Sequence, residues 1–384
     1  MAITDNDTYP LWYIQQVEGI RTDVRLVNLQ LLYNDSYINQ MKEKLYSSAP
    51  LPITMPEKKY VQGIRDVLPY VDYGLTDSVE LKDLFDVLVS DNEDDKIEMQ
   101  DGSKENFLPT KKFKLSVHTD QLIKTGTISP EEKNLVAPVM EWNYTKNYVT
   151  KSDLAVMDIL VHNNWKRPVY FSAGTSSDSY FGLDNYLHLE GYAYRLLPFK
   201  RDISDKRNKS ETAHSQPMYD HLMNKFQLNS FKKTAYLDPE SRRIANMTWN
   251  SFNTLAANLY QEGKASQAKN VMFKALDNLP LHNYTITDTV IKYRSAINLY
   301  QLHEINKATI LVKSAVKFLN SELTYYASLN EEDQRFAVND IRDVASLLES
   351  FKQMANTYKQ ELVSKEIDDI YKSLEDKLIF SLQG

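Results

Sequence analysis

The chain has 384 residues, a length that suits two domains better than one. Hydrophobic residues make up 42%, charged residues 25%, the formal net charge is -7, and there are no cysteines. The acidic balance argues against a nucleic-acid-binding surface, and the lack of cysteine excludes disulfides, cysteine-ligated zinc, iron–sulfur clusters and thiol catalysis. The sequence contains no apolar run near the ~20 residues that a membrane-spanning helix needs.

The first part of the chain alternates helical and extended patterns. Pro10 suits the first turn of a helix and Gly19 suits its end. Branched apolar residues then indicate a strand, and prolines break the chain further on. The pattern predicts, in order, a helix over 8–19, a strand over 24–32, a helix over 36–45, a proline-rich loop over 50–56, a helix over 81–89, an exposed acidic loop over 91–98 and a strand over 112–117.

The same alternation continues to residue 198. We expect a helix over 153–163 capped by Ser152, and a buried strand over 169–171 that runs into Ser172-Ala173-Gly174. A helical step over 183–187 with Gly191 as its C-cap precedes a last strand over 192–198. Helix, short turn and apolar strand in succession predict an α/β domain over 1–200, with a parallel or mixed sheet, flanking helices and a Rossmann-like arrangement.

The second part of the chain is predicted to be helical. Charged and polar residues after 200 indicate a linker and connecting segment over 201–240, followed by an all-α domain over 241–384. Small and apolar residues recur there at a spacing of 40, against ~34 in a usual tetratricopeptide repeat. In the second copy, His303-Glu304 takes the place of the turn glycine Gly263. The matching positions are Ala256, Leu259, Ala268, Met272 and Ala275 in the first copy, and Ala296, Leu299, Ala308, Val312 and Ala315 in the second.

Two groups of residues are candidates for ligand binding. Asp5, Asn6 and Asp7 precede the first helix, where carboxylates and an amide can bind a metal or a sugar hydroxyl. The alternative is that Asp7 or the next threonine simply caps the helix. Trp12, Tyr13 and Arg21 follow on or just after the same helix, where core packing is the alternative for Trp12. The second group, later in the chain, consists of Tyr180, Glu190 and Arg195.

Arg195 is unusual because it lies within an apolar strand. A half-buried arginine needs a carboxylate partner, which either Glu190 or the loop with Asp5 and Asp7 can supply. An internal ion pair and the recognition of an anion or sugar are the two interpretations.

Sequence motifs for catalysis and for cofactors are absent. The chain has no GxSxG, Walker A or GxGxxG motif, and its seven histidines are scattered without a metal-binding spacing. We therefore predict no catalytic residues, no metal site and no cofactor. An α/β enzyme that uses Asp5 and Asp7, with Arg195 as a further group, remains an alternative.

Three segments together carry a family resemblance. They are residues 5–13 (Asp-Asn-Asp-Thr-Tyr-Pro-Leu-Trp-Tyr), residues 18–25 with Asn28-Leu29, and residues 180–196. They resemble the C-terminal soluble region of large bacterial membrane proteins labelled domain of unknown function 2723. The membrane half of that family is similar to protein O-mannosyltransferases, and its soluble region ends in tetratricopeptide-like helices. In the family an apolar strand and a glycine precede the Asp-Asn-Asp segment, so we expect this strand to be missing or cut short here.

The resemblance implies an accessory role. In such glycosyltransferases the catalytic carboxylates belong to the membrane half, so this chain would bind acceptor, glycan or partner protein in the periplasm, with the membrane half as its partner. The chain would then be a piece of a longer protein, and a cytoplasmic location is the alternative. A stand-alone tetratricopeptide-type adaptor, binding peptides in a helical groove, is the main alternative function.

Overall fold

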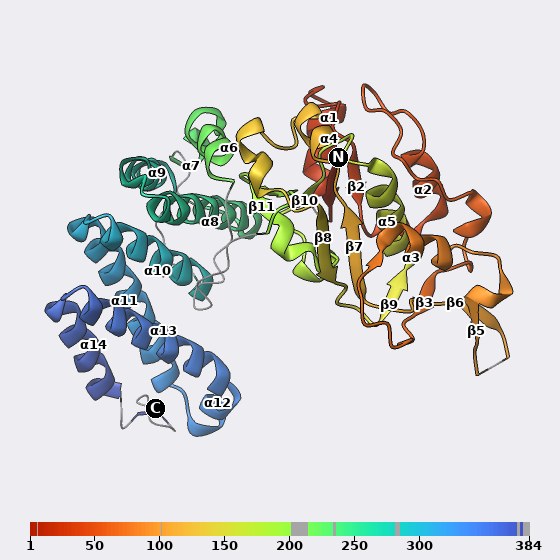
Figure 1. Ribbon diagram of the computed structural model, residues 1–384. Coiled ribbons are helices and arrows are strands. Elements are labelled where there is room, and N and C mark those ends of the chain that lie inside the picture. The colour runs from red at the N-terminus through yellow and green to blue at the C-terminus, as the bar shows by residue number, and fades with distance from the viewer. Residues whose placement is uncertain are drawn as a thin grey trace. The chain divides into compact units, whose positions relative to one another are not determined.

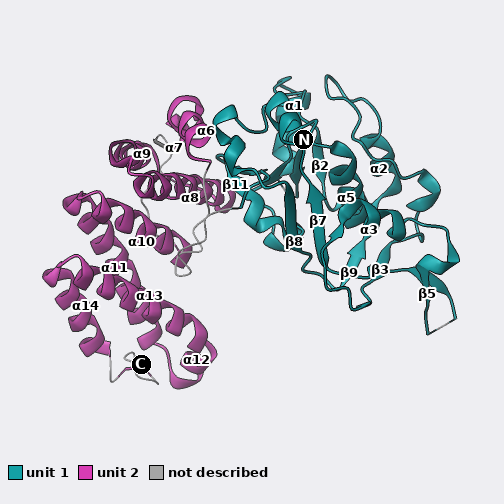
Figure 2. Cartoon of the chain, in the orientation of Figure 1, with its two compact units in different colours: residues 1–212 teal, residues 213–384 magenta. Residues whose placement is uncertain are grey.

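The computed structural model describes residues 1–5, 7–100, 102–200, 214–232, 236–280, 285–374 and 377–378. The chain divides into two compact units, residues 1–212 and 213–384 (Figure 2). The first unit contains sheets and helices and the second is helical, which confirms the predicted order of an α/β domain and an all-α domain. In the described residues, no helix combines the length and apolar character that a membrane crossing requires.

The first unit is built from short strands and five helices within its described residues (Figure 1). The helices are α1 (Thr8–Gln16), α2 (Asp35–Met41), α3 (Leu81–Leu88), α4 (Thr119–Lys124) and α5 (Lys151–Asn163). The strands are β1 (Ala2–Thr4), β2 (Leu26–Asn28), β3 (Val67–Pro69), β4 (Val79–Glu80), β5 (Lys96–Glu98), β6 (Lys104–Asn106), β7 (Lys112–Ser116), β8 (Val139–Asn143), β9 (Tyr148–Thr150), β10 (Tyr170–Ser172), β11 (Leu187–Leu189) and β12 (Ala193–Leu196).

The main sheet has five strands in the order β11-β12-β10-β1-β2. β1 runs parallel to both β10 and β2, with Ile3 opposite Phe171 and Val27. β12 and β11 continue the sheet in antiparallel fashion, so the sheet is mixed. Ile3, Val27 and Phe171 are fully buried and form the apolar face of the sheet. A strand therefore precedes the Asp-Asn-Asp segment, where we expected one to be missing or cut short, and it has three residues.

Smaller sheets and a buried helix complete the first unit. β4, β7 and β8 form a three-stranded sheet, and β3 pairs with β9 and β5 with β6. α5 packs beside α3, and nearly all of its residues are buried (Figure 1). A helix buried on every side has no polar face, which explains why its sequence shows little amphipathic contrast.

Several local predictions need correction. The cap of α5 is Thr150, whose Oγ1 accepts from the Asp153 N–H at 3.1 Å, whereas the Ser152 hydroxyl donates to the Leu29 carbonyl at 2.8 Å. Gly191 forms the turn between β11 and β12 and does not end a helix. Only three residues of the predicted 24–32 strand are extended, and the 183–187 step is a 3-10 helix over Leu183–Tyr186.

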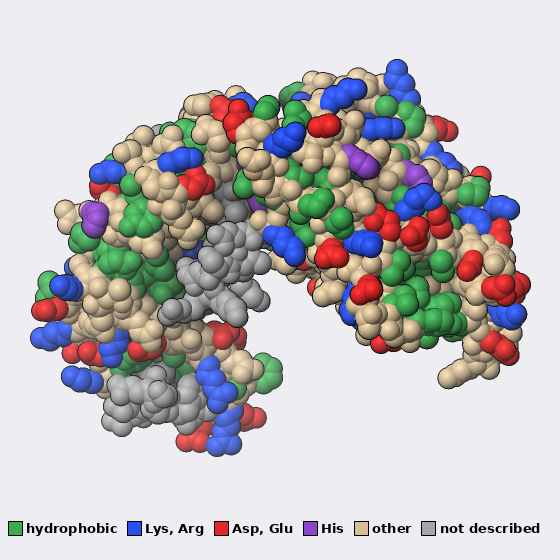
Figure 3. Space-filling model, viewed as in Figure 1, with side chains coloured by type: hydrophobic (Ala, Val, Ile, Leu, Met, Phe, Trp, Pro, Cys, Tyr) green, Lys and Arg blue, Asp and Glu red, His purple; other side chains and the backbone are tan. Residues whose placement is uncertain are grey.

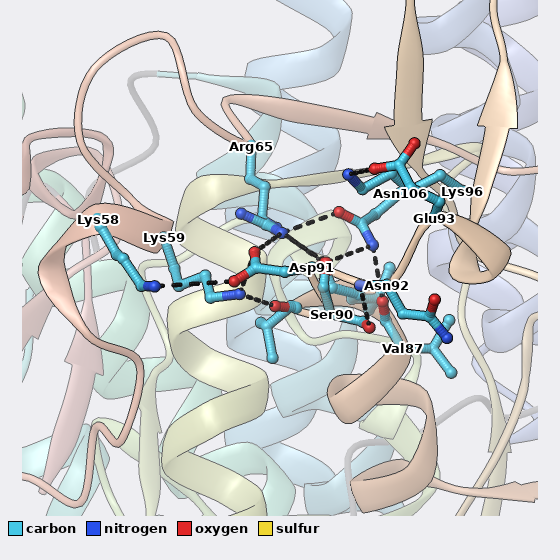
Figure 4. Close-up of polar contacts among 12 residues, drawn as sticks. Lys58, Lys59, Arg65, Val87, Ser90, Asp91, Asn92, Glu93, Lys96 and Asn106 are labelled. Carbon is cyan, nitrogen blue, oxygen red and sulfur yellow. Dashed lines mark hydrogen bonds and ion pairs between the residues drawn. The ribbon is translucent and has the colours of Figure 1, made fainter.

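The end of α3 is held by side chains from elsewhere in the chain (Figure 4). Arg65 Nε donates to the Leu88 carbonyl at 3.0 Å, and Lys59 Nζ donates to the Val89 carbonyl at 2.6 Å. Asn106 Nδ2 donates to the Val87 carbonyl at 2.9 Å. Two cations and an amide thus satisfy the open carbonyls at the negative end of the helix dipole.

The acidic segment that follows α3 is also more ordered than its composition predicts. Its residues form a 3-10 helix over Glu93–Asp95 and then β5, not a simple exposed loop. The Asp91 carboxylate pairs with Lys59 and lies 3.6 Å from Arg65 Nη2 and 3.8 Å from Lys58 Nζ (Figure 4). On the face shown in Figure 3, acidic and basic side chains are intermixed, as they are around Asp91.

The second unit consists of consecutive helices. Shorter helical segments, including a π-helix over His221–Lys225, precede a series of longer helices that pack in pairs (Figure 1). The helices are α6 (Ser215–Asp220), α7 (Asn229–Lys232), α8 (Pro239–Gln261), α9 (Ala265–Asn278), α10 (Ile286–Gln301), α11 (Ile305–Ala327), α12 (Glu331–Phe336), α13 (Val338–Thr357) and α14 (Glu361–Leu374).

The pairs α8–α9, α10–α11 and α13–α14 share one turn geometry. Gly263, His303 and Lys359 occupy equivalent places and have φ of 76°, 59° and 57°. In each turn the next N–H donates back to a carbonyl five residues earlier, at 2.7–2.9 Å, as in a Schellman motif. His303, at the place of the turn glycine in the pattern, therefore takes the left-handed conformation that glycine adopts in the first pair.

The recurring small residues lie where the helices of a pair touch. Ala256, Ala268, Ala296 and Ala308 are all buried, as are the larger residues of both copies. Alanine at these positions allows the two helix backbones to approach closely. The helix pairs thus share a common turn and buried equivalent positions, and the assignment of the unit as tetratricopeptide-like stays a prediction.

Candidate functional site

The loops that follow β1, β2 and β10 meet at one edge of the main sheet. β1 is parallel to both neighbours, so the three strands have their carboxyl ends at the same edge. The chain leaves β1 through α1 to β2 on one side, whereas β10 lies on the other side. In open α/β sheets, the crevice at such a reversal of strand order is the usual ligand position.

Asp7 faces the end of β10 across this reversal. Ser172 Oγ donates to Asp7 Oδ2, and the N–H of Gly174 donates to Ser172 Oγ at 3.2 Å. A Cβ built on Gly174 would overlap the Asp7 carboxylate, so the absence of a side chain there makes room for Asp7. The Asp7 side chain makes no capping hydrogen bond to α1, which corrects the interpretation of Asp7 as a helix cap. We call Asp7, Ser172 and Gly174 the sheet-edge site.

A buried polar network fixes the loop that carries Asp7. Asn28 Nδ2, at the end of β2, donates to the Asp5 carbonyl and to Thr8 Oγ1, both at 3.0 Å. Thr8 Oγ1 also donates to the Asp5 carbonyl at 2.7 Å and lies 2.5 Å from Thr4 Oγ1. Thr4, Thr8 and Asn28 are all buried. Because every member has a partner in a region of low dielectric, the loop is held in one conformation.

α1, which begins directly after Asp7, carries exposed aromatic side chains. The Tyr9 ring is 58% exposed and meets the partly buried Trp12 edge-on, with 5.9 Å between ring centroids. Tyr13, one turn after Tyr9, is 57% exposed. Trp12 is therefore not a fully packed core residue, and Tyr9 and Tyr13 present open ring faces.

Tyr180 supports the other side of the site. Its hydroxyl donates to the Thr175 carbonyl at 3.0 Å and to the Ser172 carbonyl at 3.4 Å, so it holds the segment that bears Ser172 and Gly174. The next residue, Phe181, is buried and has φ of 59°, a strained backbone conformation for a bulky side chain.

Glu190, directly after β11, and Arg195, on β12, form an ion pair. Arg195 Nη1 lies 3.3 Å from Glu190 Oε1, and Arg195 Nη2 donates to the Gly126 carbonyl at 2.6 Å. The Tyr170 hydroxyl donates to Glu190 Oε2 at 3.2 Å. Burial, and then the negative charge of Glu190, raise the pKa of Tyr170 to about 12. Of the two partners proposed for Arg195, the structure selects Glu190.

The predicted residues thus separate into distinct positions. Asp7 and Tyr180 both contact Ser172 at the end of β10. The pair of Glu190 and Arg195 lies elsewhere, beside Tyr170 at the start of β10. Asp5 contributes its backbone carbonyl. Arg21 is exposed and forms a bidentate pair with Asp23. Asn6 lies outside the described residues.

Sequence reasoning did not identify Ser172, Gly174 or Asn28 as site residues. One available signal was their position directly after, or at the end of, apolar strands, where parallel topology gathers such residues. No group of three or more His, Asp or Glu side chains within the described ranges is placed to hold a metal ion.

Comparison with known proteins identifies one family. The model of the family described as TMEM260-associated domain 2 matches residues 1–214. No curated protein and no solved structure matches the chain. The matched range includes the sheet-edge site and every described residue of the first unit.

Proposed function

The chain belongs to the TMEM260-associated domain 2 family, and from this premise we propose that it is the accessory recognition region of a membrane glycosyltransferase-like protein. The family description associates the domain with a membrane protein. In our proposal the chain lies on the extracytoplasmic side, next to the membrane half of its parent. There it binds a glycan or an acceptor and leaves bond-making to the membrane half.

The observation that carries this proposal is the Asp7 carboxylate held against Ser172 at the sheet edge, at the start of a helix that bears exposed aromatic rings. The Asp7 carboxylate can accept hydrogen bonds from sugar hydroxyls, and the Ser172 hydroxyl beside it offers a further polar contact. Tyr9, two residues along the chain, presents an exposed ring against which the apolar face of a sugar can pack. A few placed polar groups beside an apolar surface are the usual composition of a small-ligand site.

The same geometry favours recognition over catalysis. An enzyme based on Asp5, Asp7 and Arg195 would need these groups to act on one substrate atom. Asp5 instead contributes a backbone carbonyl to the loop, and the guanidinium of Arg195 is taken up by Glu190 and the Gly126 carbonyl. The Asp7 carboxylate accepts from Ser172 Oγ, which holds its position.

Two substitutions test the sheet-edge site without removing its fold. Asp7→Asn removes the charge, and we expect it to weaken binding of the best ligand from a glycan array by at least tenfold, because a hydrogen bond to a charged group contributes about 1.5–3 kcal/mol. Gly174→Ala keeps the carboxylate but forces it aside, and we expect a similar loss with an unchanged melting temperature. Titration calorimetry against the array hit measures both.

The aromatic contribution has a matched control. We expect Tyr9→Ala to weaken glycan binding several-fold and Tyr325→Ala, on α11, to leave it unchanged, since both rings are 58% exposed. The proposal is wrong if the folded chain binds no glycan, or if Gly174→Ala and Asp7→Asn bind as tightly as the unmodified chain.

A second candidate function rests on the helical unit. A groove between α11 and α14 includes three lysines, Lys313, Lys317 and Lys365, together with Glu366 and Asp369. Within the described residues these lysines form no ion pair with a carboxylate. A groove with lysines that form no ion pair, flanked by acceptors, suits a peptide that carries acidic side chains. Binding such a peptide would be the function of an adaptor.

Charge reversal tests the adaptor function. In a labelled peptide library read by fluorescence anisotropy, we expect Lys313→Glu/Lys317→Glu to lower the affinity of acidic peptides at least tenfold and to reduce its salt dependence. Lys264→Glu, in the turn between α8 and α9, is the control. Equal binding by the groove variant and the control would exclude the groove as a peptide site.

A further inference from the structure

An apolar surface on the first unit includes Tyr13 of α1 but none of the three residues of the sheet-edge site. Tyr13 on α1 and Val17, the residue that caps the end of this helix, are 57% and 66% exposed. Ile20, Leu45 and Tyr46 are 47%, 42% and 49% exposed. We call these five residues the apolar patch.

A hydrogen bond joins the chain next to the two segments of the apolar patch. Thr22 Oγ1, two residues after Ile20, is hydrogen-bonded to Ser47 Oγ, directly after Tyr46, at 3.0 Å. A tight turn in which the Leu45 and Ser48 backbones bond to each other presents Leu45 and Tyr46. Large apolar side chains exposed together on adjoining segments mark an interaction surface.

Cations lie near the segment that bears Leu45 and Tyr46. Lys44 precedes Leu45, and Arg167 donates to the Ala49 and Pro50 carbonyls at 3.0–3.2 Å, with Lys166 beside it. In the parts of the chain that the structure describes, neither lysine nor Arg167 pairs with a carboxylate. Glu18 and Glu43 lie nearby in the sequence, so the net positive charge around the apolar patch is small.

We propose that the apolar patch docks on a lipid bilayer surface. Tyrosine and tryptophan rings are suited to the headgroup level of a membrane, where one end of the ring is apolar and the other reaches water. A helix with an apolar face lies in that plane, and cations beside it add attraction to anionic headgroups. This inference does not depend on glycan binding and uses no residue of the sheet-edge site.

The patch composition favours lipid over a protein partner. Tyrosine and aliphatic side chains supply most of the surface. Lys44, Lys166 and Arg167 form no ion pair with a carboxylate within the described residues, so anionic headgroups can approach them. Arg21, next to Ile20, is already paired with Asp23. The membrane-associated family places a bilayer within reach of the chain. If a second copy of the chain or another protein occupies the patch instead, the experiment below gives a different outcome.

Vesicle co-sedimentation of the full chain tests the proposal. We expect the chain to bind phosphatidylcholine vesicles that contain 30% phosphatidylglycerol, about a third anionic lipid, which probes the surface charge. In pure phosphatidylcholine we expect this binding to weaken only several-fold. Tyr13→Ser/Val17→Ser is expected to lower the partition coefficient at least tenfold. The matched control Tyr325→Ser/Ile310→Ser, on α11 and 58% and 66% exposed, is expected to bind like the unmodified chain.

Tryptophan fluorescence gives an independent measurement. Trp142, Trp165 and Trp249 are buried, whereas Trp12 is partly exposed and adjoins Tyr13. We therefore expect vesicles to shift the emission to shorter wavelength, and Trp12→Phe to remove the shift while co-sedimentation persists. Asp7→Asn should leave vesicle binding unchanged, which separates this proposal from glycan recognition.

Three results would overturn lipid docking. They are the absence of co-sedimentation, equal losses for patch and control variants, or a patch-dependent dimer in sedimentation velocity without vesicle binding.

Discussion

Asp158→Ala is expected to destabilise the first unit by about 3–5 kcal/mol, a large part of the stability of an ordinary domain. The Asp158 carboxylate on α5 is fully buried and accepts from the backbone N–H groups of Thr54 and Met55 at 2.8 and 2.9 Å. It also accepts from Thr54 Oγ1 at 2.9 Å and lies 2.7 Å from His162 Nδ1. Alanine would leave these donors buried without partners.

Asp158→Asn distinguishes the hydrogen bonds from the charge. The amide oxygen can accept from Thr54 and Met55, so we expect the loss to be only about 1–2 kcal/mol. Burial, the largest influence, raises the pKa of Asp158 above 3.8, so the folded state retains a proton that the unfolded state has lost. The stability of the unmodified chain should therefore fall, relative to Asp158→Asn, as pH rises from about 3.8 through the raised pKa.

The measurement must resolve the two units. Urea titration read by pulsed hydrogen exchange and mass spectrometry follows peptides of each unit separately. We expect only the first unit to lose stability in Asp158→Ala. Asp86→Ala removes an exposed carboxylate that pairs with Lys82, and its effect should stay within about 0.5 kcal/mol. Equal effects of Asp158→Ala and Asp86→Ala would contradict the role given to Asp158.

The second large effect is expected from Gly182→Ala, which should cost the first unit about 2–5 kcal/mol. Gly182 has φ of 76°, which a side chain rarely tolerates. A Cβ there would also overlap the carbonyl oxygen of Asn143, at the end of β8, and would lie 3.4 Å from Trp142 Cδ1. The Asn143 backbone is paired with Lys112 in the sheet, so moving it aside would break the strand pairing.

Gly74→Ala separates the backbone cost from the steric cost. Gly74 has φ of 67° and no atom within 4 Å of the position of a Cβ, so we expect only the conformational penalty of about 1–2 kcal/mol. The same urea and hydrogen-exchange experiment compares the two variants. If Gly74→Ala is as destabilising as Gly182→Ala, the contact with Asn143 contributes nothing.

The sequence predicted part of the candidate site. Asp7 was identified from its place before a helix, and Glu190 was named as a partner of Arg195 because the two are close along the chain. Ser172 and Gly174 were missed because Ser172 is 165 residues from Asp7, and no local pattern links such distant segments. The choice between capping and a side-chain role for Asp7 also depended on that distant contact.

Some features of this chain follow from local chemistry, and others follow only from long-range packing. The sequence alone determined the order of an α/β and a helical domain, the recurrence of buried alanines such as Ala268 and Ala308, and the turn at His303, because side-chain periodicity and turn chemistry act over a few residues. Only the tertiary structure decided that β1 is central, that Asp7 meets Ser172 and that Asp158 holds Thr54. These contacts arise from how strands and helices bury their apolar faces together, a property of the whole chain and not of any one segment.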